Sequence, residues 1–347
     1  MRIVLFGIMI FFLLNSLLLA DLYEVSKTEV DFPGLGKFTS EQDGYYRIMQ
    51  MKEVSNSDMK GQGIFGKIMA SFFSEGKNGK IIDLKSELIT TLDYKSKKYS
   101  EIPLREFFSH DVEEDAAPDK QEEQSEKAPV RIVRHELKVT DMKISRNIND
   151  FMTEEYNIIY IVETENTETK EHQTDSLFIT LFTTAENQTI SEANRIRNEY
   201  YQNLFKASSM EIDFQETQKI MGTEWVNILR SMNSGNQPAV HEPDYSQLQK
   251  IKGYPILITG SYFMKKPPEN IEEEPVEKPK FGLTGLKKGL VKSIGKSLEK
   301  EKQLEAGGYE KVIDYRIETV KIEITDLQDN IFTVPDGFTR GKEYKFK

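Results

Sequence analysis

The stretch from Asn149 to Thr184 constrains the fold more than any other part of the chain. It contains two segments, Tyr156–Glu163 and Ser176–Thr184, that are rich in Tyr, Ile, Val, Phe and Thr. These residues favour a pleated surface. The polar residues between the two segments (Thr, Glu, Asn, Lys and His) mark a reversal of the chain. The stretch therefore predicts a long β-hairpin, with other strands as its neighbours and helices as its covers.

Further β-rich segments lie on both sides of this hairpin. On the N-terminal side they read LYEVSKTEV, GYYRIMQMKEV, KIIDLKSELITTLDY and KKYSEIPL, and turn-rich PGLGK and SEQDG separate the first two. A polar turn at Lys95–Lys98 joins the last two, and Arg131–Ser145 leads into the hairpin in an extended pattern. On the C-terminal side, YPILITGSYFMKK and YEKVIDYRIETVKIEITDL would pair antiparallel, and IFTVPDGFTRGKEYKF would form a terminal strand with a Pro-Asp-Gly turn. The pattern predicts an α+β fold built on a large, twisted antiparallel sheet.

Three segments have the apolar spacing of helices that cover such a sheet. The first predicted helix ends at Gly76 and has an apolar face made of Ile64, Phe65, Ile68, Met69, Phe72 and Phe73. The second is Ser191–Ala207, with Ile196, Tyr200, Leu204 and Phe205 towards the core. The third is Asp213–Met232, with Trp225 on its apolar face. Trp225 is interpreted either as a core residue or as a residue that stacks on a ligand.

The first twenty residues are typical of a secretory signal peptide. Arg2 supplies a positive charge, Ile3–Leu14 an apolar run, and Ala20 a small residue before a possible cleavage site. The alternative is an uncleaved membrane anchor, although Asn15 and Ser16 interrupt a run that is barely long enough to cross a bilayer. We therefore expect an exported protein of the periplasm or cell envelope, with residues 21–347 forming a single domain.

The composition excludes several classes of function. Of the 347 residues, 38% are hydrophobic and 30% are charged, and the net charge is −11. Nucleic acid is not expected as a partner, because phosphate binding needs a cationic surface. The chain has no Cys, which excludes disulfides, thiolate catalysis and zinc–thiolate sites.

Two polar segments are predicted to interrupt the domain. Residues 111–127 are acidic and nearly free of large apolar side chains, so we expect a disordered acidic loop. Residues 267–308 combine a Pro- and Glu-rich tether with a basic amphipathic helix over 281–304. This helix either binds an anionic membrane surface or lays its apolar ridge across the sheet as a lid. The apolar ridge consists of Leu286, Leu290, Ile294 and Leu298, and the cationic ridge of Lys288, Lys292, Lys296 and Lys300.

No catalytic motif stands out in the sequence. The glycines at 61, 63 and 66 match the letters of a dinucleotide fingerprint, but a polar stretch precedes them where a buried strand is required. The four His residues are scattered, and neither a nucleophile elbow nor a Walker loop is present. We therefore expect no enzyme activity, no metal and no cofactor.

Four short motifs resemble an exported bacterial domain related to the periplasmic lipoprotein-carrier and lipoprotein-sorting superfamily. They are the strand–turn–strand IIDLKSELITTLDYKSKKYSEIPL, INDFMTEEYNI, KGYPI and DNIFTVPDGFTR, in that order. The chain departs from the family pattern at Asp150, where Gly is usual, and at Thr153, where Cys is usual. The resemblance implies a β half-barrel whose concave face, covered by helices, holds acyl chains through a general apolar lining.

The expected function is non-enzymatic binding of a lipid or other apolar ligand. The alternative is an envelope interaction or scaffold protein whose sheet is packed solid by its helices. The sequence does not specify the oligomeric state. The expected lining of the ligand site is Ile64, Phe65, Ile68, Met69, Phe72 and Trp225.

Overall fold

The computed structural model describes residues 20–63, 76–108, 130–208, 244–265 and 308–341. These residues form one 12-stranded sheet, in the order β12-β6-β5-β4-β3-β2-β1-β11-β10-β9-β8-β7. All neighbours are antiparallel except β12 and β6. The sheet is open, with β12 and β7 at its two edges. The strands are β1 (Asp21–Phe32), β2 (Gly36–Arg47), β3 (Gln50–Gly61), β4 (Gly76–Asp83), β5 (Leu88–Asp93), β6 (Lys98–Pro103), β7 (Val130–Ile148), β8 (Phe151–Asn166), β9 (His172–Thr184), β10 (Tyr254–Lys265), β11 (Tyr309–Thr325) and β12 (Thr339–Arg340).

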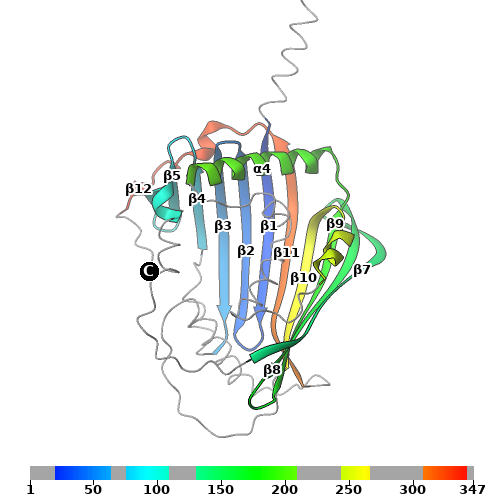
Figure 1. Cartoon of the computed structure of the whole chain (residues 1–347). Coiled ribbons are helices and arrows are strands. Elements are labelled where there is room, and N and C mark those ends of the chain that lie inside the picture. Colours follow the sequence, from blue (N-terminus) through cyan, green and yellow to red (C-terminus); the bar gives the residue numbers. More distant parts are fainter. Residues whose placement is uncertain (1–19, 64–75, 109–129, 209–243, 266–307, 342–347) are drawn as a thin grey trace, which may run out of the picture.

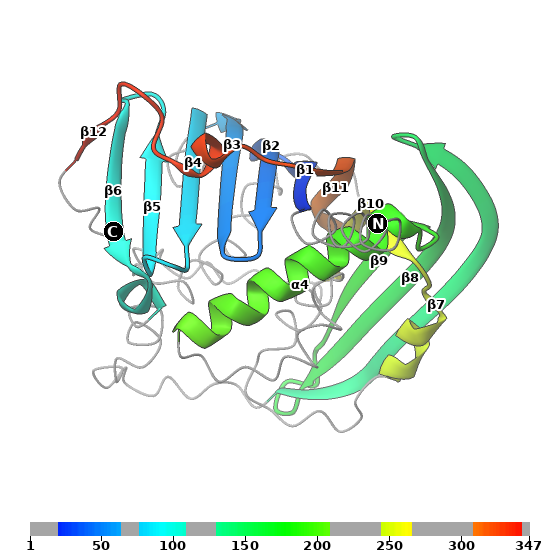
Figure 2. The ribbon, with the colours of Figure 1, turned by 90° about the horizontal axis from the view of Figure 1, so that it is seen from above.

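The sheet consists of two meanders that meet in its middle. Strands β1 to β6 follow one another on one side, and β7 to β10 follow one another on the other side. Strand β11 lies between β1 and β10, so the first strand pairs with the last long strand (Figure 1). Seen from above, the sheet bends, and β7, β8 and β9 turn towards the side on which the long helix lies (Figure 2).

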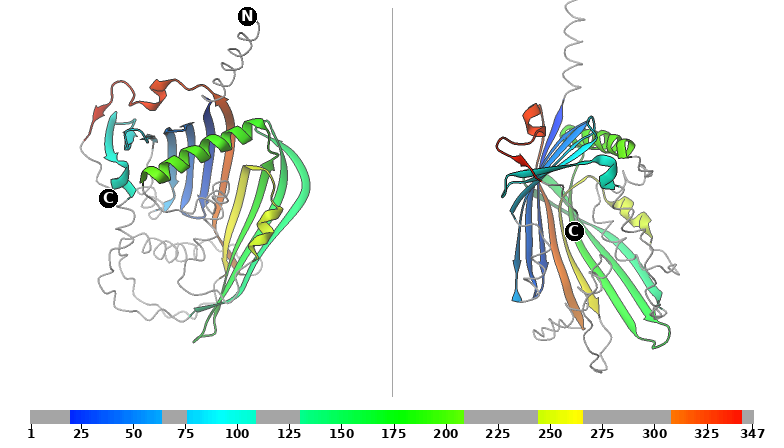
Figure 3. Two further views of the ribbon diagram at one scale, coloured as in Figure 1. Left: turned by 45° about the horizontal axis from the view of Figure 1, so that its top comes forward. Right: turned by 90° about the vertical axis from the view of Figure 1, so that its left-hand side faces the viewer.

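The long helix α4 (Gln188–Ser208) crosses one face of the sheet (Figure 3). It packs mainly against β11, β2 and β1. Its apolar positions recur at helical spacing and are buried, as the sequence predicts for Ile196, Tyr200 and Leu204. They meet side chains such as Leu22, Met51 and Ile89 in one core cluster. We call the face that α4 covers the inner face and the opposite face the outer face.

A short helical segment over 104–108 follows β6, and two short 3₁₀ helices complete the described structure. Helix η1 (Tyr245–Lys250) packs against β7, and η2 (Asp329–Phe332) packs against β3. The chain after β11 lies across β3, where the Lys52 ammonium donates a hydrogen bond to the Ile331 carbonyl at 2.7 Å.

The predicted large antiparallel sheet is confirmed, and so is the long hairpin. Strand β9 pairs with β8 over its whole length, from Thr184 with Thr153 to His172 with Glu165. The hairpin does not occupy the centre of the sheet, however, because only β7 separates it from an edge. The predicted pairing of the strands at 254–265 and 309–325 is also confirmed, as β10 with β11.

Four predicted boundaries are wrong. GYYRIMQMKEV is not one strand, because the chain reverses between Arg47, where β2 ends, and Gln50, where β3 begins. SEQDG is not a turn: it lies within β2, whose polar residues pair with β1 on one side and β3 on the other. KIIDLKSELITTLDY is two strands rather than one, because Glu87 adopts a positive φ and the Asp83 carboxylate accepts a hydrogen bond from the Lys85 amide. The terminal segment forms η2 and then a strand of only two residues, because its backbone binds Lys52 instead of a neighbouring strand.

Candidate functional site

The residues that the sequence predicts as site residues lie outside the described part of the chain. This holds for the predicted helix with Ile64, Phe65, Ile68, Met69 and Phe72, and for Trp225. It also holds for the predicted basic helix with Leu286, Leu290, Ile294, Leu298, Lys288 and Lys292, and for the acidic segment at 111–127. The candidate site is therefore built from the sheet and from α4.

A half-buried ion pair joins α4 to the inner face. Arg197 of α4 lies 3.6 Å from the Glu24 carboxylate of β1, and it donates a 2.8 Å hydrogen bond to the Tyr254 hydroxyl of β10. The Arg197 guanidinium also lies over the Tyr254 ring. Burial raises the pKa of Tyr254 to about 12, and the Glu24 charge adds to this effect. The Arg197 pKa is lowered by burial but raised more strongly by Glu24 and Tyr254, so the guanidinium stays charged.

Beyond α4, the inner face continues over β7 to β11 as an apolar surface, which we call the inner apolar face. It arises from strict alternation along the strands, since every second side chain points to the same side. Of the described elements beside the sheet, η1 contributes Tyr245 and Leu248 to it, and Ile251 follows directly. The inner apolar face consists of Leu137, Val139, Tyr156, Ile158, Tyr160, Val162, Leu177, Ile179, Leu181, Ile258 and Tyr315.

Polar groups interrupt the inner apolar face at a few points. The Tyr160 hydroxyl is hydrogen-bonded to the His135 ring nitrogen at 2.6 Å. Asp175 projects to the same face, and burial raises its pKa, while hydrogen bonds from Gln173 and Tyr262 lower it by less. The Tyr315 hydroxyl is buried without a hydrogen-bond partner. Among the described residues of the inner apolar face, this hydroxyl is the buried side-chain donor that has no acceptor.

The outer face is polar over β1, β2 and β11. It carries exposed ion pairs such as Lys27–Glu41 and Lys37–Glu29. The Tyr23 and Tyr45 rings stack on this face at 5.0 Å, and the Lys321 ammonium lies over Tyr23. This is the pattern of a sheet with one solvated face.

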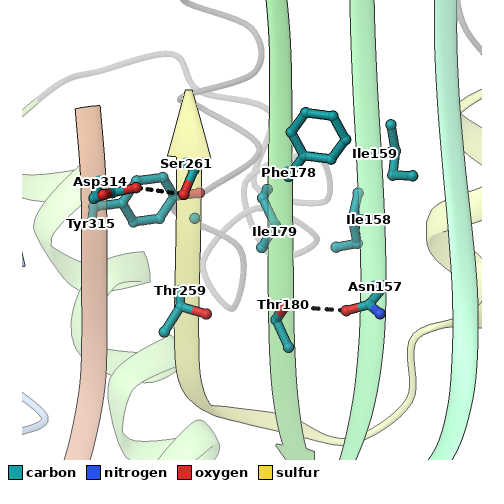
Figure 4. Close-up of a pocket in the computed structure, with 11 residues that line it drawn as sticks. Asn157, Ile158, Ile159, Phe178, Ile179, Thr180, Thr259, Ser261, Asp314 and Tyr315 are labelled. Atoms are coloured by element: carbon teal, nitrogen blue, oxygen red, sulfur yellow. Dashed lines mark hydrogen bonds between the residues drawn. The ribbon is translucent and has the colours of Figure 1, made fainter. Parts of the chain in front are cut away.

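A hollow of about 450 Å³ interrupts the outer face over β8 to β11. Its walls are two rows of outward-pointing side chains, and its floor is the backbone row through Ile158, Ile179, Gly260 and Tyr315. Figure 4 shows that hydrogen bonds join Ser261 to Asp314 and Thr180 to Asn157 within the walls. The wall residues are Asn157, Thr180 and Thr259 in one row and Ile159, Phe178, Ser261 and Asp314 in the other.

The described residues contain no group of three or more His, Asp or Glu side chains arranged to hold a metal ion. None of the described helices is both long enough and apolar enough to cross a membrane.

Sequence reasoning missed the sheet as a source of site residues. The signal was present, because Tyr156, Ile158, Tyr160 and Val162 alternate in β8 and predict one apolar face. The hollow was not predictable in this way, because it depends on which residues of four strands lie side by side.

Comparison with known proteins finds no matching family model, no matching curated protein and no matching solved structure.

Proposed function

We propose that this chain binds a lipid or another apolar ligand on the inner apolar face and does not catalyse a reaction. The observation that carries the proposal is the continuous apolar lining of β7 to β11, on the side towards which the sheet bends (Figure 2). In this proposal the sheet is a half-barrel and the inner apolar face is its concave side. Apolar contact of this kind scales with buried area and needs few polar groups.

The Tyr315 hydroxyl supports a ligand with one polar group near its apolar chain. A buried hydroxyl without a partner costs about 1–3 kcal/mol. A carbonyl or ester oxygen of a bound lipid would accept this hydrogen bond and offset the cost. The ring of Tyr315 is held over Gly260, so its hydroxyl has a defined position.

Other parts of the proposal rest on the sequence. The first twenty residues support export to the periplasm or cell envelope. The basic helix predicted over 281–304 would act as a lid over the ligand or as a contact to an anionic membrane.

A second candidate function is an envelope scaffold with a solidly packed sheet. The observation that favours it is the near-complete burial of the inner apolar face, where Tyr156, Ile158 and Tyr160 are at most 1% exposed. A face filled by the chain's own side chains would leave no room for an acyl chain.

Native mass spectrometry of the gently purified protein tests the proposal. The first readout is mass in the lipid range that co-purifies with the chain or is taken up from added phospholipid. Ile158→Phe adds bulk to the inner apolar face, whereas Ile161→Phe makes the same change on the outer face of the same strand. We expect Ile158→Phe to reduce the bound fraction and Ile161→Phe to leave it unchanged.

Each result separates the two candidates. Bound lipid that is lost in Ile158→Phe, with thermal melting showing that both variants are folded, supports the carrier. An apo mass for the wild-type protein, with no uptake of added lipid, contradicts the carrier and supports the scaffold.

A further inference from the structure

The hollow on the outer face is separate from the inner apolar face. Strand alternation places its wall residues on the side opposite Tyr156, Ile158 and Tyr160. Its volume of about 450 Å³ falls within the range of roughly 300–1,000 Å³ that is usual for small-molecule sites. Short side chains at Thr259 and Ser261 leave its backbone floor open.

The wall chemistry is mixed rather than apolar. Asn157, Thr180, Thr259 and Ser261 bring amide and hydroxyl groups that both donate and accept hydrogen bonds. The Thr180 hydroxyl donates to Asn157 Oδ1 at 3.1 Å, which leaves the two N–H donors of the Asn157 amide for a ligand. Within the described residues, Thr259 has no side-chain partner.

One aromatic ring borders these polar groups. The Phe178 side chain is 43% exposed and lies beside Ile159 in the wall (Figure 4). The Phe263 ring packs edge-to-face against the Phe178 ring, with the two ring centroids 5.6 Å apart. The wall therefore presents a fixed apolar surface next to hydrogen-bonding groups.

The charge of the hollow disfavours an anionic ligand. Its one charged wall residue is Asp314, whose carboxylate accepts hydrogen bonds from Ser261 and, at 3.1 Å, from Lys311. Since Lys311 is already paired with Asp314, a bound anion would face the carboxylate. A ligand made only of hydrocarbon would leave the amide and hydroxyl groups without partners.

We propose that this hollow is a binding site for a neutral carbohydrate. The hydroxyl groups of a pyranose ring both donate and accept, and so match the Asn, Thr and Ser side chains. The C–H face of the ring is apolar and packs on Phe178 and Ile159. The hollow would give the chain a second binding function that does not depend on a lipid on the inner face.

The test is a titration of the full-length protein with methyl glycosides of glucose, galactose, mannose and N-acetylglucosamine, followed by amide NMR shifts. At least one glycoside is expected to cause saturable shifts at 157–159, 178–180, 259–261 and 314–315. Thr259→Leu and Asn157→Leu fill the hollow and remove its hydrogen-bonding groups, so each should abolish these shifts. Thr39→Leu is the matched control, because Thr39 lies on the outer face of β2, away from the hollow.

Three results would overturn the proposal. They are the absence of saturable shifts with all four glycosides, shifts that persist in both hollow-filling variants, and binding of glucose 6-phosphate without binding of the glucoside. Retention of the wild-type spectrum outside the hollow shows that each variant is folded, so loss of binding in a variant can be read as loss of the site.

Discussion

Asp175 is a carboxylate whose ionisation opposes folding. Burial raises its pKa above the ordinary value of 3.8, and the hydrogen bonds from Gln173 and Tyr262 offset only part of this effect. In the folded protein Asp175 therefore keeps its proton at pH values where the unfolded chain has lost it. Its contribution to stability is thus largest below pH 3.8 and decreases as the pH rises through the folded pKa.

Replacement of Asp175 by Asn removes this ionisation and keeps an acceptor for the Tyr262 hydroxyl. We expect Asp175→Asn to raise the melting temperature at neutral pH and to change it little in acid. The measurement is thermal unfolding as a function of pH. Asp58→Asn, at an exposed position on β3, is the control for the loss of a carboxylate from the sheet. A loss of stability at neutral pH in Asp175→Asn would contradict this account.

Gly260 and Tyr315 make the closest contact on the inner apolar face. A Cβ at Gly260 would lie 2.3–2.5 Å from atoms of the Tyr315 ring, so the ring would have to move. We expect Gly260→Ala to destabilise the fold by about 1–3 kcal/mol, the usual cost of overpacking. Chemical denaturation measures this loss.

The same substitution in a Tyr315→Leu background isolates the contact. Leu does not reach over Gly260 as the tyrosine ring does. In this background Gly260→Ala should therefore lower the free energy of unfolding by much less. A double-mutant cycle gives the coupling between the two positions. Equal costs in both backgrounds would show that the ring is not the obstacle.

At the scale of elements, α4 is attached to the sheet by a half-buried ion pair as well as by its apolar positions. Arg197, whose side chain is 15% exposed, faces Glu24 of β1, whereas Arg195, two residues earlier, is 37% exposed and pairs with Glu192 and Glu199 on α4 itself. We expect Arg197→Met to cost about 1–3 kcal/mol, because the half-buried Glu24 carboxylate then keeps only the 3.3 Å hydrogen bond from the Tyr254 hydroxyl.

The control for Arg197→Met lies on the same helix. Arg195→Met breaks only exposed pairs, so it should cost at most about 1 kcal/mol. Adding Glu24→Gln to Arg197→Met removes the unpaired charge and should recover part of the lost stability. Unfolding free energies from denaturant titration compare the three proteins. Similar losses for Arg197→Met and Arg195→Met would rule out the half-buried pair as the attachment.

Elements with a clear period were predictable from the sequence, and elements set by distant partners were not. Helix α4 and strands β8 to β11 have regular patterns, and their positions were predicted closely. Strand β2 was divided wrongly, since its polar residues are held by partners on both sides. In β7, register shifts between Ile132 and Arg134 and between Asp141 and Ser145 break the alternation, and the exposed apolar residues Val133 and Ile144 lie within these shifts.

At the scale of the whole molecule, the sequence predicts the class of sheet but not the order of its strands. The hairpin at 151–184 has the strongest local pattern, yet its place near an edge depends on β11 pairing with both β1 and β10. The inner apolar face and the hollow depend on the same long-range pairing. Local periodicity identifies apolar helices, whereas the inner apolar face and the hollow each require strands that are far apart in the sequence.

The position of β11 has a consequence for how the protein is made. During synthesis, β1 to β6 and β7 to β10 emerge first, and each series can pair locally as it leaves the ribosome. The two series cannot join until β11 has been translated, because it is the strand that bridges them. Joining β1 to β11 closes a loop that spans most of the chain, and long-range strand pairing of this kind folds slowly. Until β11 arrives, the edges of β1 and β10 stay unpaired, so the growing chain is most exposed to aggregation just before its last long strand is completed.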